Sequence, residues 1–261
     1  MHGILAKMDN RLLGALPADA VERLRPHLER VELARGDRLH GAGEAERFVY
    51  FPIDCVVSLF CVIENGASAE MSVVGNEGML GVAVFMGDGR SMSQAVTIAP
   101  GYAYRLAGQH LSREVSRGDD LCRLLLRYLQ ALFSQIAQTA VCNRHHTIDQ
   151  QLCRWLLQML DRLPGNEVAM TQEMIASMLG VRREGVTEAA RKLQLRGAIS
   201  YRRGRITVLD RSKLERQSCE CHAVVKAEED RLLSTTRPIS RATAARVVRR
   251  STSRVTAALA G

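Results

Sequence analysis

The sequence predicts an α+β protein in three parts: an N-terminal antiparallel β-roll, a long helix, and two short helices followed by a β-hairpin. Short β-prone runs alternate with turn residues between Val31 and Leu106. Apolar residues then recur at helical spacing from about Asp119 to Asn143. Two further amphipathic stretches meet at Gly180. The change in the period of the apolar residues is what divides the chain.

Residues 1–118 are expected to form the β-roll. Residues 10–30 have helical spacing, and the period changes to that of strands at Val31. Asn65-Gly66 lies between two apolar runs, which is a strong signal for a β-hairpin. Many short strands with regular turns predict an antiparallel barrel or roll. The β-prone runs are residues 31–33, 48–51, 56–62, 69–74, 95–98 and 102–106.

Residues 119–143 are expected to form a dimerisation helix. One row of side chains is spaced alternately by four and three residues, the pattern by which two helices pack along each other. The row is Leu125, Leu129, Leu132, Ile136, Thr139 and Asn143. The alternative is that this row packs on the chain's own β-roll. Leu121, Leu124 and Tyr128 on a neighbouring face are expected to do that instead, which leaves the row for a second copy of the chain.

Residues 171–193 are expected to form two short helices joined by a tight turn. The Thr171 hydroxyl can cap the first helix, and Gly180 tolerates the positive φ of a sharp reversal. The buried face of the second helix is Val186, Ala189, Ala190 and Leu193. Charged and hydroxyl side chains occupy its leading end, and in a helix-turn-helix this end enters the major groove. The alternative is a helical hairpin with a solvated charged face.

Residues 199–209 follow as two β-prone runs around an Arg-Gly turn, which predicts a wing whose basic tip contacts phosphates. The residues expected to contact DNA are Thr171, Gln172, Arg182, Arg183, Glu184, Thr187, Glu188, Arg191, Tyr201, Arg202, Arg203 and Arg205. The DNA-binding domain is expected to span residues 144–233, with a hinge at 144–146 and flanking helices over 148–163 and 214–233. Residues 234–261 have little apolar content and are predicted to be a disordered basic tail.

Charge and cysteine usage fit this division. The chain has 261 residues and a net charge of +8. Residues 1–143 carry 14 basic and 16 acidic side chains, residues 144–233 carry 16 and 12, and residues 234–261 carry six arginines and no acid. The basic half is the half expected to bind double-stranded DNA.

No apolar run approaches the roughly 18 residues that span a membrane. The start lacks a signal-peptide core and the seven cysteines are scattered, so a cytoplasmic protein with reduced thiols is expected.

A β-roll, a long helix, a hinge and a winged helix-turn-helix in this order resemble the Crp/Fnr family of bacterial transcription regulators over residues 10–215. The resemblance is strongest from Thr171 to Leu209, where Gly180-Val181-Arg182-Arg183-Glu184 looks like the family's turn and recognition-helix start. It implies a cyclic-nucleotide-binding-like roll, a homodimer on an inverted-repeat operator, base reading by Arg183 and Glu184, and RNA polymerase as a further partner. Glu188 stands where the cyclic-AMP receptor has an arginine, so the operator is expected to differ.

The ligand chemistry of that family's sensory domain is not matched. Gly81-Val82-Ala83 stands where the family uses Gly-Glu-Leu for the ribose, and a valine side chain accepts no hydrogen bond. The positions that meet adenine fall near Ile136-Ala137, which are apolar, although Arg90-Ser91 resembles the phosphate-binding pair. Control by cyclic AMP is therefore not expected, and the pocket either binds another ligand or is a filled core. The candidate effector residues are Gly78, Gly81, Val82, Arg90, Ser91 and Ile136.

No cofactor and no metal are expected. An N-terminal iron–sulfur cluster is not supported because the region before Cys55 contains no cysteine. Haem stays open, with His27, His40 and His110 available. Cys219-x-Cys221-His222 has the spacing of metal ligands, but no second cysteine–histidine pair lies nearby in the sequence.

The leading hypothesis is a homodimeric, sequence-specific DNA-binding transcription regulator. The alternative is a small-molecule or redox sensor that acts mainly through protein contacts. No nucleophile–base pair, phosphate-binding loop or paired carboxylates are recognisable, so an enzyme is not expected.

Overall fold

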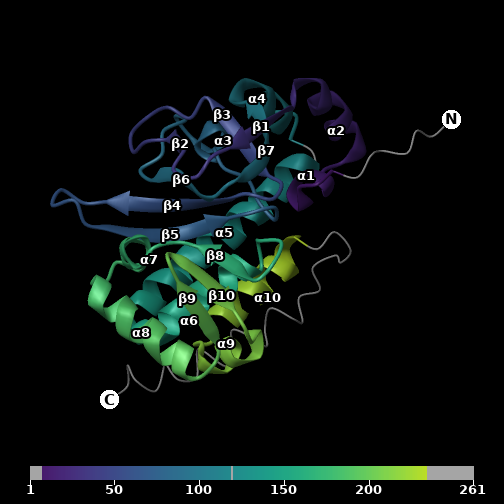
Figure 1. Ribbon diagram of the computed structural model, residues 1–261. Coiled ribbons are helices and arrows are strands. Elements are labelled where there is room, and N and C mark those ends of the chain that lie inside the picture. Colours follow the sequence, from purple (N-terminus) through teal and green to yellow (C-terminus); the bar gives the residue numbers. More distant parts are fainter. Residues whose placement is uncertain (1–7, 119, 234–261) are drawn as a thin grey trace, which may run out of the picture.

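The computed structural model describes residues 8–118 and 120–233, in two domains joined by one long helix (Figure 1). The predicted tail over residues 234–261 lies outside the described residues. An N-terminal β-roll with short helices lies at one end of the molecule, and a mainly helical C-terminal domain packs against it (Figure 1). The predicted α+β class is confirmed.

The roll consists of two antiparallel sheets with strand orders β1-β7-β3 and β2-β6-β4-β5. Their strands are β1 Glu29–Leu33, β2 Arg38–His40, β3 Phe48–Pro52, β4 Val56–Val62, β5 Ser68–Val74, β6 Gln94–Ala99 and β7 Gly101–Ala107. The Asn65-Gly66 hairpin joins β4 to β5, and Gly66 has a φ of 84°. Strand β2 is too short to have an apolar period of its own, and it was not predicted.

Short helices close the roll. They are α1 Arg11–Gly14, α2 Ala18–Leu24, the 3-10 helix η1 Arg25–His27, α3 Ala83–Met86 and α4 Gly108–Val115. The predicted helix over residues 10–30 is thus three shorter pieces, because Pro17 separates α1 from α2 and Pro26 lies in η1. Side chains of α1, α2 and α4 form a cluster with α5, to which Leu121, Leu124 and Tyr128 contribute as predicted.

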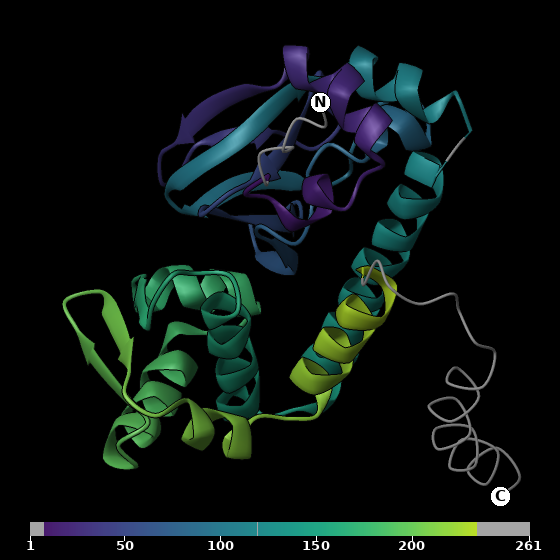
Figure 2. The same cartoon turned by 90° about the vertical axis from the view of Figure 1, so that its right-hand side faces the viewer.

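Helix α5 spans Asp120–His145 and leaves the roll to reach the C-terminal domain (Figure 2). The predicted dimer row on this helix is mostly covered by the chain itself. Four of its six members, Leu125, Leu129, Leu132 and Thr139, are buried within the chain itself. Ile136 packs against the interior of the roll, and Asn143 is exposed. The row that faces solvent is the neighbouring one, which contains Leu126, Phe133, Ala137 and Val141.

The C-terminal domain contains the predicted helix-turn-helix and wing. Its elements are α6 Ile148–Leu160, β8 Glu167–Ala169, α7 Gln172–Leu179, α8 Arg183–Leu195, β9 Ile199–Arg202, β10 Arg205–Val208, α9 Arg211–Gln217 and α10 Cys221–Leu233. Strands β8, β10 and β9 form one antiparallel sheet. The expected single helix over residues 214–233 is wrong, because the chain turns at Ser218–Glu220 and α10 then lies along α5 (Figure 2).

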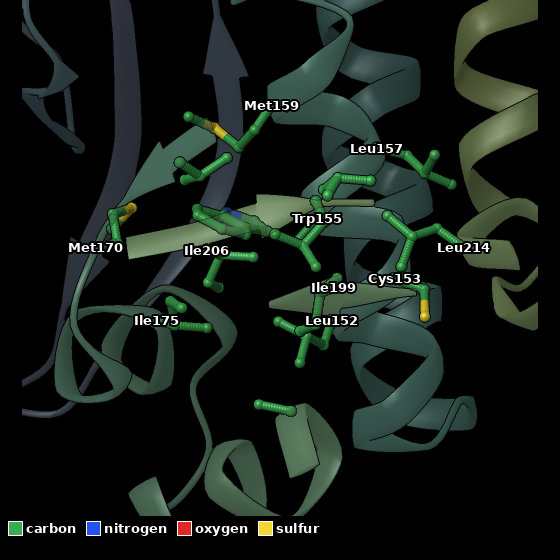
Figure 3. Packing of buried hydrophobic residues seen from close by; sticks show 14 of the residues in the cluster. Leu152, Cys153, Trp155, Leu157, Met159, Met170, Ile175, Ile199, Ile206 and Leu214 are labelled. Carbon is green, nitrogen blue, oxygen red and sulfur yellow. The ribbon is translucent and has the colours of Figure 1, made fainter. Parts of the chain in front are cut away.

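One apolar core runs through both domains. Trp155 on α6 is fully buried. Around it lie Leu152 of the same helix, Met170 just after β8, Ile199 of β9 and Ile206 of β10 (Figure 3). The same cluster includes residues of the β2-β6-β4-β5 sheet, namely Val56, Val73, Ile98 and Ala99. The outer face of that sheet therefore belongs to the core of the C-terminal domain. No helix of the described residues is long and apolar enough to cross a membrane.

Candidate nucleic-acid interface

Helices α7 and α8 are joined as the sequence predicts. The Thr171 hydroxyl accepts a hydrogen bond from the Met174 N–H at 3.2 Å and caps α7. Gly180 ends α7 in the left-handed conformation with a φ of 64°, which favours glycine. Val186 and Leu193 are buried, so one face of α8 is fixed against the domain and the opposite face points to solvent.

The first turn of α8 presents three charged side chains to solvent: Arg182, Arg183 and Glu184. Among the described residues, none of the three side chains has a hydrogen-bond or ion-pair partner in the protein. An arginine side chain can donate two hydrogen bonds to guanine, and a glutamate can accept one from cytosine. These groups are available for such contacts without first breaking an internal bond.

The next turn of α8 is exposed but internally bonded. The Thr187 hydroxyl donates to Gln172 Oε1 at 2.7 Å, which joins α8 to the start of α7. Glu188 accepts two hydrogen bonds from the Arg191 guanidinium, at 2.9 and 3.0 Å, and these lower the pKa of Glu188. Exposed pairs of this kind contribute little to stability and exchange readily. DNA contacts by Glu188 or Arg191 would therefore compete with this pair.

The wing is the β9–β10 hairpin. Arg203 and Gly204 form its turn with positive φ values of 48° and 73°, as a two-residue hairpin turn of this type requires. Arg202 and Arg203 are exposed, and their side chains have no partner among the described residues. Arg205 instead forms an ion pair with Glu167 Oε1 on β8 at 2.5 Å. The free positive charge of the wing is thus concentrated at two of the three predicted arginines.

Tyr201, which is predicted to contact phosphates, has a partner within the domain. Its hydroxyl donates a hydrogen bond to the Met170 carbonyl oxygen at 2.8 Å, and its ring is only partly exposed against the core. The side chain thereby fixes the wing to the strand that leads into α7. The sequence could not show this bond, because its acceptor is a backbone carbonyl 31 residues away.

The helix-turn-helix rests directly on the roll. A Cβ atom on Gly180 would lie 3.2 Å from Ala69 Cβ on β5. Arg162, just after α6, is buried and donates to Glu77 Oε1 at 2.8 Å. This pair was not predicted from the sequence. Glu77 Oε1 also accepts from the Gly75 N–H at 3.1 Å, so the same carboxylate fixes its own turn and joins the two domains.

Comparisons with known proteins agree with this geometry. Residues 150–217 match the family model of the Crp-like helix-turn-helix domain. The matched residues run from α6 to α9 and include the helix-turn-helix and the wing. No curated protein matches the chain in sequence.

Solved structures extend the likeness to both domains. A Crp/Fnr family protein from Eubacterium rectale is 17% identical, with a TM-score of 0.64 over 79% of this chain and 96% of that one. FixK2 from Bradyrhizobium japonicum is 16% identical, with a TM-score of 0.61 over 74% and 98%. TTHB099, a CRP family transcriptional regulator from Thermus thermophilus, is 20% identical, with a TM-score of 0.59 over 73% and 96%. The chain thus combines the fold of Crp/Fnr regulators with a Crp-like DNA-binding domain, which confirms the resemblance.

The predicted effector residues have different surroundings in the part of the chain that the structure describes. Val82 and Ile136 pack against an apolar cluster that fills the space between the two sheets. A Cβ on Gly78 would meet the Tyr128 ring at 2.6 Å. Arg90 is exposed and donates to the Gly43 carbonyl oxygen at 3.0 Å. The two remaining residues, Gly81 and Ser91, lie against Phe48 and Ser93 respectively.

A carboxylate of the protein itself lies at the start of α3, just after Gly81-Val82. Glu46 Oε2 accepts the Ala83 N–H at 2.9 Å, and Glu46 Oε1 lies 3.2 Å from His40 Nε2. Burial raises the pKa of Glu46, and the neighbouring His40 and the backbone N–H oppose that rise. An incoming phosphate would have to displace this bonded carboxylate.

A second group of polar side chains lies where α5 ends. Cys142 near the end of α5 and His146, the first residue after this helix, meet Cys219 in the turn before α10 and Cys221 at the start of α10. The sequence pattern pointed only to Cys219 and Cys221, together with His222. That histidine lies elsewhere, since its Nε2 is 2.8 Å from Asp161 Oδ2. The i, i+4 spacing of Cys142 and His146 is a local signal in the sequence that could have identified this group.

Proposed function

We propose that the protein is a sequence-specific DNA-binding transcription regulator that acts as a homodimer on an inverted-repeat operator. The observation that carries this proposal is the first turn of α8, where Arg182, Arg183 and Glu184 are exposed. Like Arg202 and Arg203 of the wing, they have no hydrogen-bond or ion-pair partner within residues 8–118 and 120–233. Base-reading groups on a helix and phosphate-binding groups on an adjacent hairpin are the two kinds of contact that specific DNA binding needs.

The exposed row on α5 supports the homodimer. Leu126 and Phe133 are 57% and 59% exposed, although both are large and apolar. They lie seven residues apart, and Ala137 continues the row four residues later. Two copies of such a row pack along each other as a coiled coil. A two-fold dimer would present two α8 helices to successive major grooves, and its operator would be an inverted repeat.

We further propose that cyclic AMP does not control the protein. Glu46 accepts the backbone N–H at the start of α3, and Val82 and Ile136 face an apolar interior. A cyclic nucleotide would need to bury a phosphate beside this carboxylate, which is unfavourable. By analogy with the family, RNA polymerase is proposed as the protein partner of the DNA-bound regulator.

Selection of bound sequences from a random DNA library, with full-length protein in the presence and absence of cyclic AMP, tests the proposal. The expected result is an inverted repeat whose half-sites lie about one DNA turn, roughly 10 base pairs, apart. The same repeat should be recovered under both conditions. Recovery of an unstructured set of sequences, or of an operator only with cyclic AMP, would contradict the proposed function.

A further inference from the structure

The cysteine–histidine group at the end of α5 has the composition and shape of a metal site. The ligand atoms of Cys142, His146, Cys219 and Cys221 all lie within 4.8 Å of one another. The three cysteines are buried, and they form an apolar cluster separate from the main cores. Three thiols and one imidazole are a common ligand set of structural Zn²⁺.

The distances fit one tetrahedral ion. With Zn–S bonds of about 2.3 Å and Zn–N bonds of about 2.0 Å, two sulfurs of a tetrahedral site lie about 3.8 Å apart, and a sulfur and a nitrogen about 3.6 Å apart. Here Cys142 Sγ and Cys219 Sγ are 3.6 Å apart, and Cys221 Sγ and His146 Nδ1 are 3.4 Å apart. A polynuclear cluster would need wider spacing between its ligands, so the geometry fits a single ion.

The surroundings of the group are those of metal ligands. His146 turns its Nδ1 to the sulfurs, while its Nε2 lies 3.5 Å from Glu220 Oε2. A metal-bound histidine usually donates its second N–H to a carboxylate in this manner, which fixes the ring. The Gln138 side-chain amide donates to Cys221 Sγ at 3.1 Å, a contact that favours a thiolate at that position.

We propose that Cys142, His146 through Nδ1, Cys219 and Cys221 bind one Zn²⁺ ion per chain. The ion would join the end of α5, which comes from the sensory domain, to the turn between α9 and α10. Binding would displace the thiol protons, because thiolates are the ligands. This proposal does not rest on DNA binding, and none of the four residues belongs to the proposed DNA-reading surface.

Cobalt substitution of the full-length protein tests the site. The metal is removed with a chelator under reducing conditions and Co²⁺ is titrated in, followed by its visible ligand-field bands and its sulfur-to-metal charge-transfer band. Saturation at one Co²⁺ per chain with a tetrahedral thiolate spectrum, and displacement by Zn²⁺, is the expected result. A protein that is purified without metal and gives no charge-transfer band with Co²⁺ would overturn the proposal.

Paired histidine variants test the ligand assignment. His146→Gln is expected to weaken Co²⁺ binding at least about tenfold, whereas His145→Gln, at the exposed last residue of α5, should leave it unchanged. His222→Gln should also keep the spectrum, because that side chain is bonded to Asp161. Loss of the spectrum in His222→Gln but not in His146→Gln would contradict the assignment.

Cysteine variants separate metal binding from a disulfide. Cys142→Ser is expected to lose most of the charge-transfer band, and Cys122→Ser on the same helix to keep it. Mass spectrometry without reductant gives the second readout. If the wild type instead contains a Cys142–Cys219 disulfide, this bond is reduced before the Co²⁺ titration. If the reduced protein still fails to bind Co²⁺, the proposal is overturned, and this outcome does not depend on whether a variant folds.

Discussion

The indole N–H of Trp155 donates a hydrogen bond to Glu70 Oε1 at 3.1 Å, and this bond links α6 of the C-terminal domain to β5 of the roll. Glu70 also accepts from the Ser58 hydroxyl at 2.7 Å and is buried. Burial raises the pKa of Glu70 to about 7, although the hydrogen bonds and the nearby Arg154 and Arg162 oppose the rise. The contact between the two domains therefore includes a carboxyl group that titrates near neutral pH.

The stability of the protein should consequently carry a pH dependence that comes from Glu70. The folded state binds this proton more tightly than the unfolded chain, in which the Glu70 carboxyl has its ordinary pKa of about 4.5. The contribution of Glu70 to the free energy of unfolding is then fully present below about pH 4.5 and is lost as the pH rises through about 7. Urea unfolding of the wild type and Glu70→Gln at several pH values isolates this contribution. A difference between the two proteins that stays constant from pH 4.5 to 8 would refute the assignment.

Arg183→Ala and Glu184→Ala should each relax sequence preference. Their side chains open α8 and have no hydrogen-bond or ion-pair partner within the described residues, so they are available for contacts with DNA bases. Each replacement should cost about 1–3 kcal/mol on the operator and weaken discrimination at one base pair per half-site. A base-by-base binding profile measures this effect. Equal loss of affinity for every sequence would show that these residues bind the backbone instead.

Arg202→Ala should weaken binding to all sequences alike, because a phosphate contact carries no base information. The slope of log affinity against log salt should fall by about 1. Arg205→Ala should have a smaller effect, since Glu167 already pairs with that arginine. Arg113→Ala, an exposed change on α4 of the roll, is the control. A change in base preference for Arg202→Ala would mean that the wing reads sequence.

Phe133→Asp should abolish the dimer without unfolding the protomer. Phe133 is 59% exposed, so a charge there is solvated in the monomer but buried between two α5 helices in a dimer. Leu132→Ala is the matched change one residue away. Leu132 is 8% exposed within the protomer, and its truncation should cost about 2–5 kcal/mol of stability while the dimer persists. Sedimentation velocity and thermal unfolding distinguish the two outcomes. A monomer from Leu132→Ala and a dimer from Phe133→Asp would reverse the assignment.

The dimer helix shows what a single sequence can and cannot predict. The apolar period of α5 was sufficient to predict the helix and the packing of Leu121, Leu124 and Tyr128. It could not show which of two adjacent rows faces solvent, since both satisfy helical spacing. That choice depends on the roll and on α10, which cover Leu125 and Leu132 and leave Leu126 and Phe133 open.

The helix-turn-helix was predicted almost completely, because its signals are local. A cap at Thr171, a left-handed glycine at Gly180 and an apolar face each depend on neighbouring residues only. The groups that were missed depend on distant partners instead. Cys142 and Cys219 are 77 residues apart, and Arg162 and Glu77 are 85 residues apart. Neither separation leaves a local pattern in the sequence.

Gly180 lies against Ala69 of the roll, and the core around Trp155 includes residues of the roll. The C-terminal domain is therefore not structurally independent of the roll. The residues that match the DNA-binding family model end at Gln217 and begin at Gln150, yet the apolar core beneath them includes Val56, Val73 and Ile98 of the roll. Excised at those boundaries, the domain would expose an apolar surface that the sheet normally covers. To fuse residues 150–217 to a different N-terminal domain, strands β4 to β6 would therefore have to be transferred with them, or the face that these strands cover would have to be redesigned.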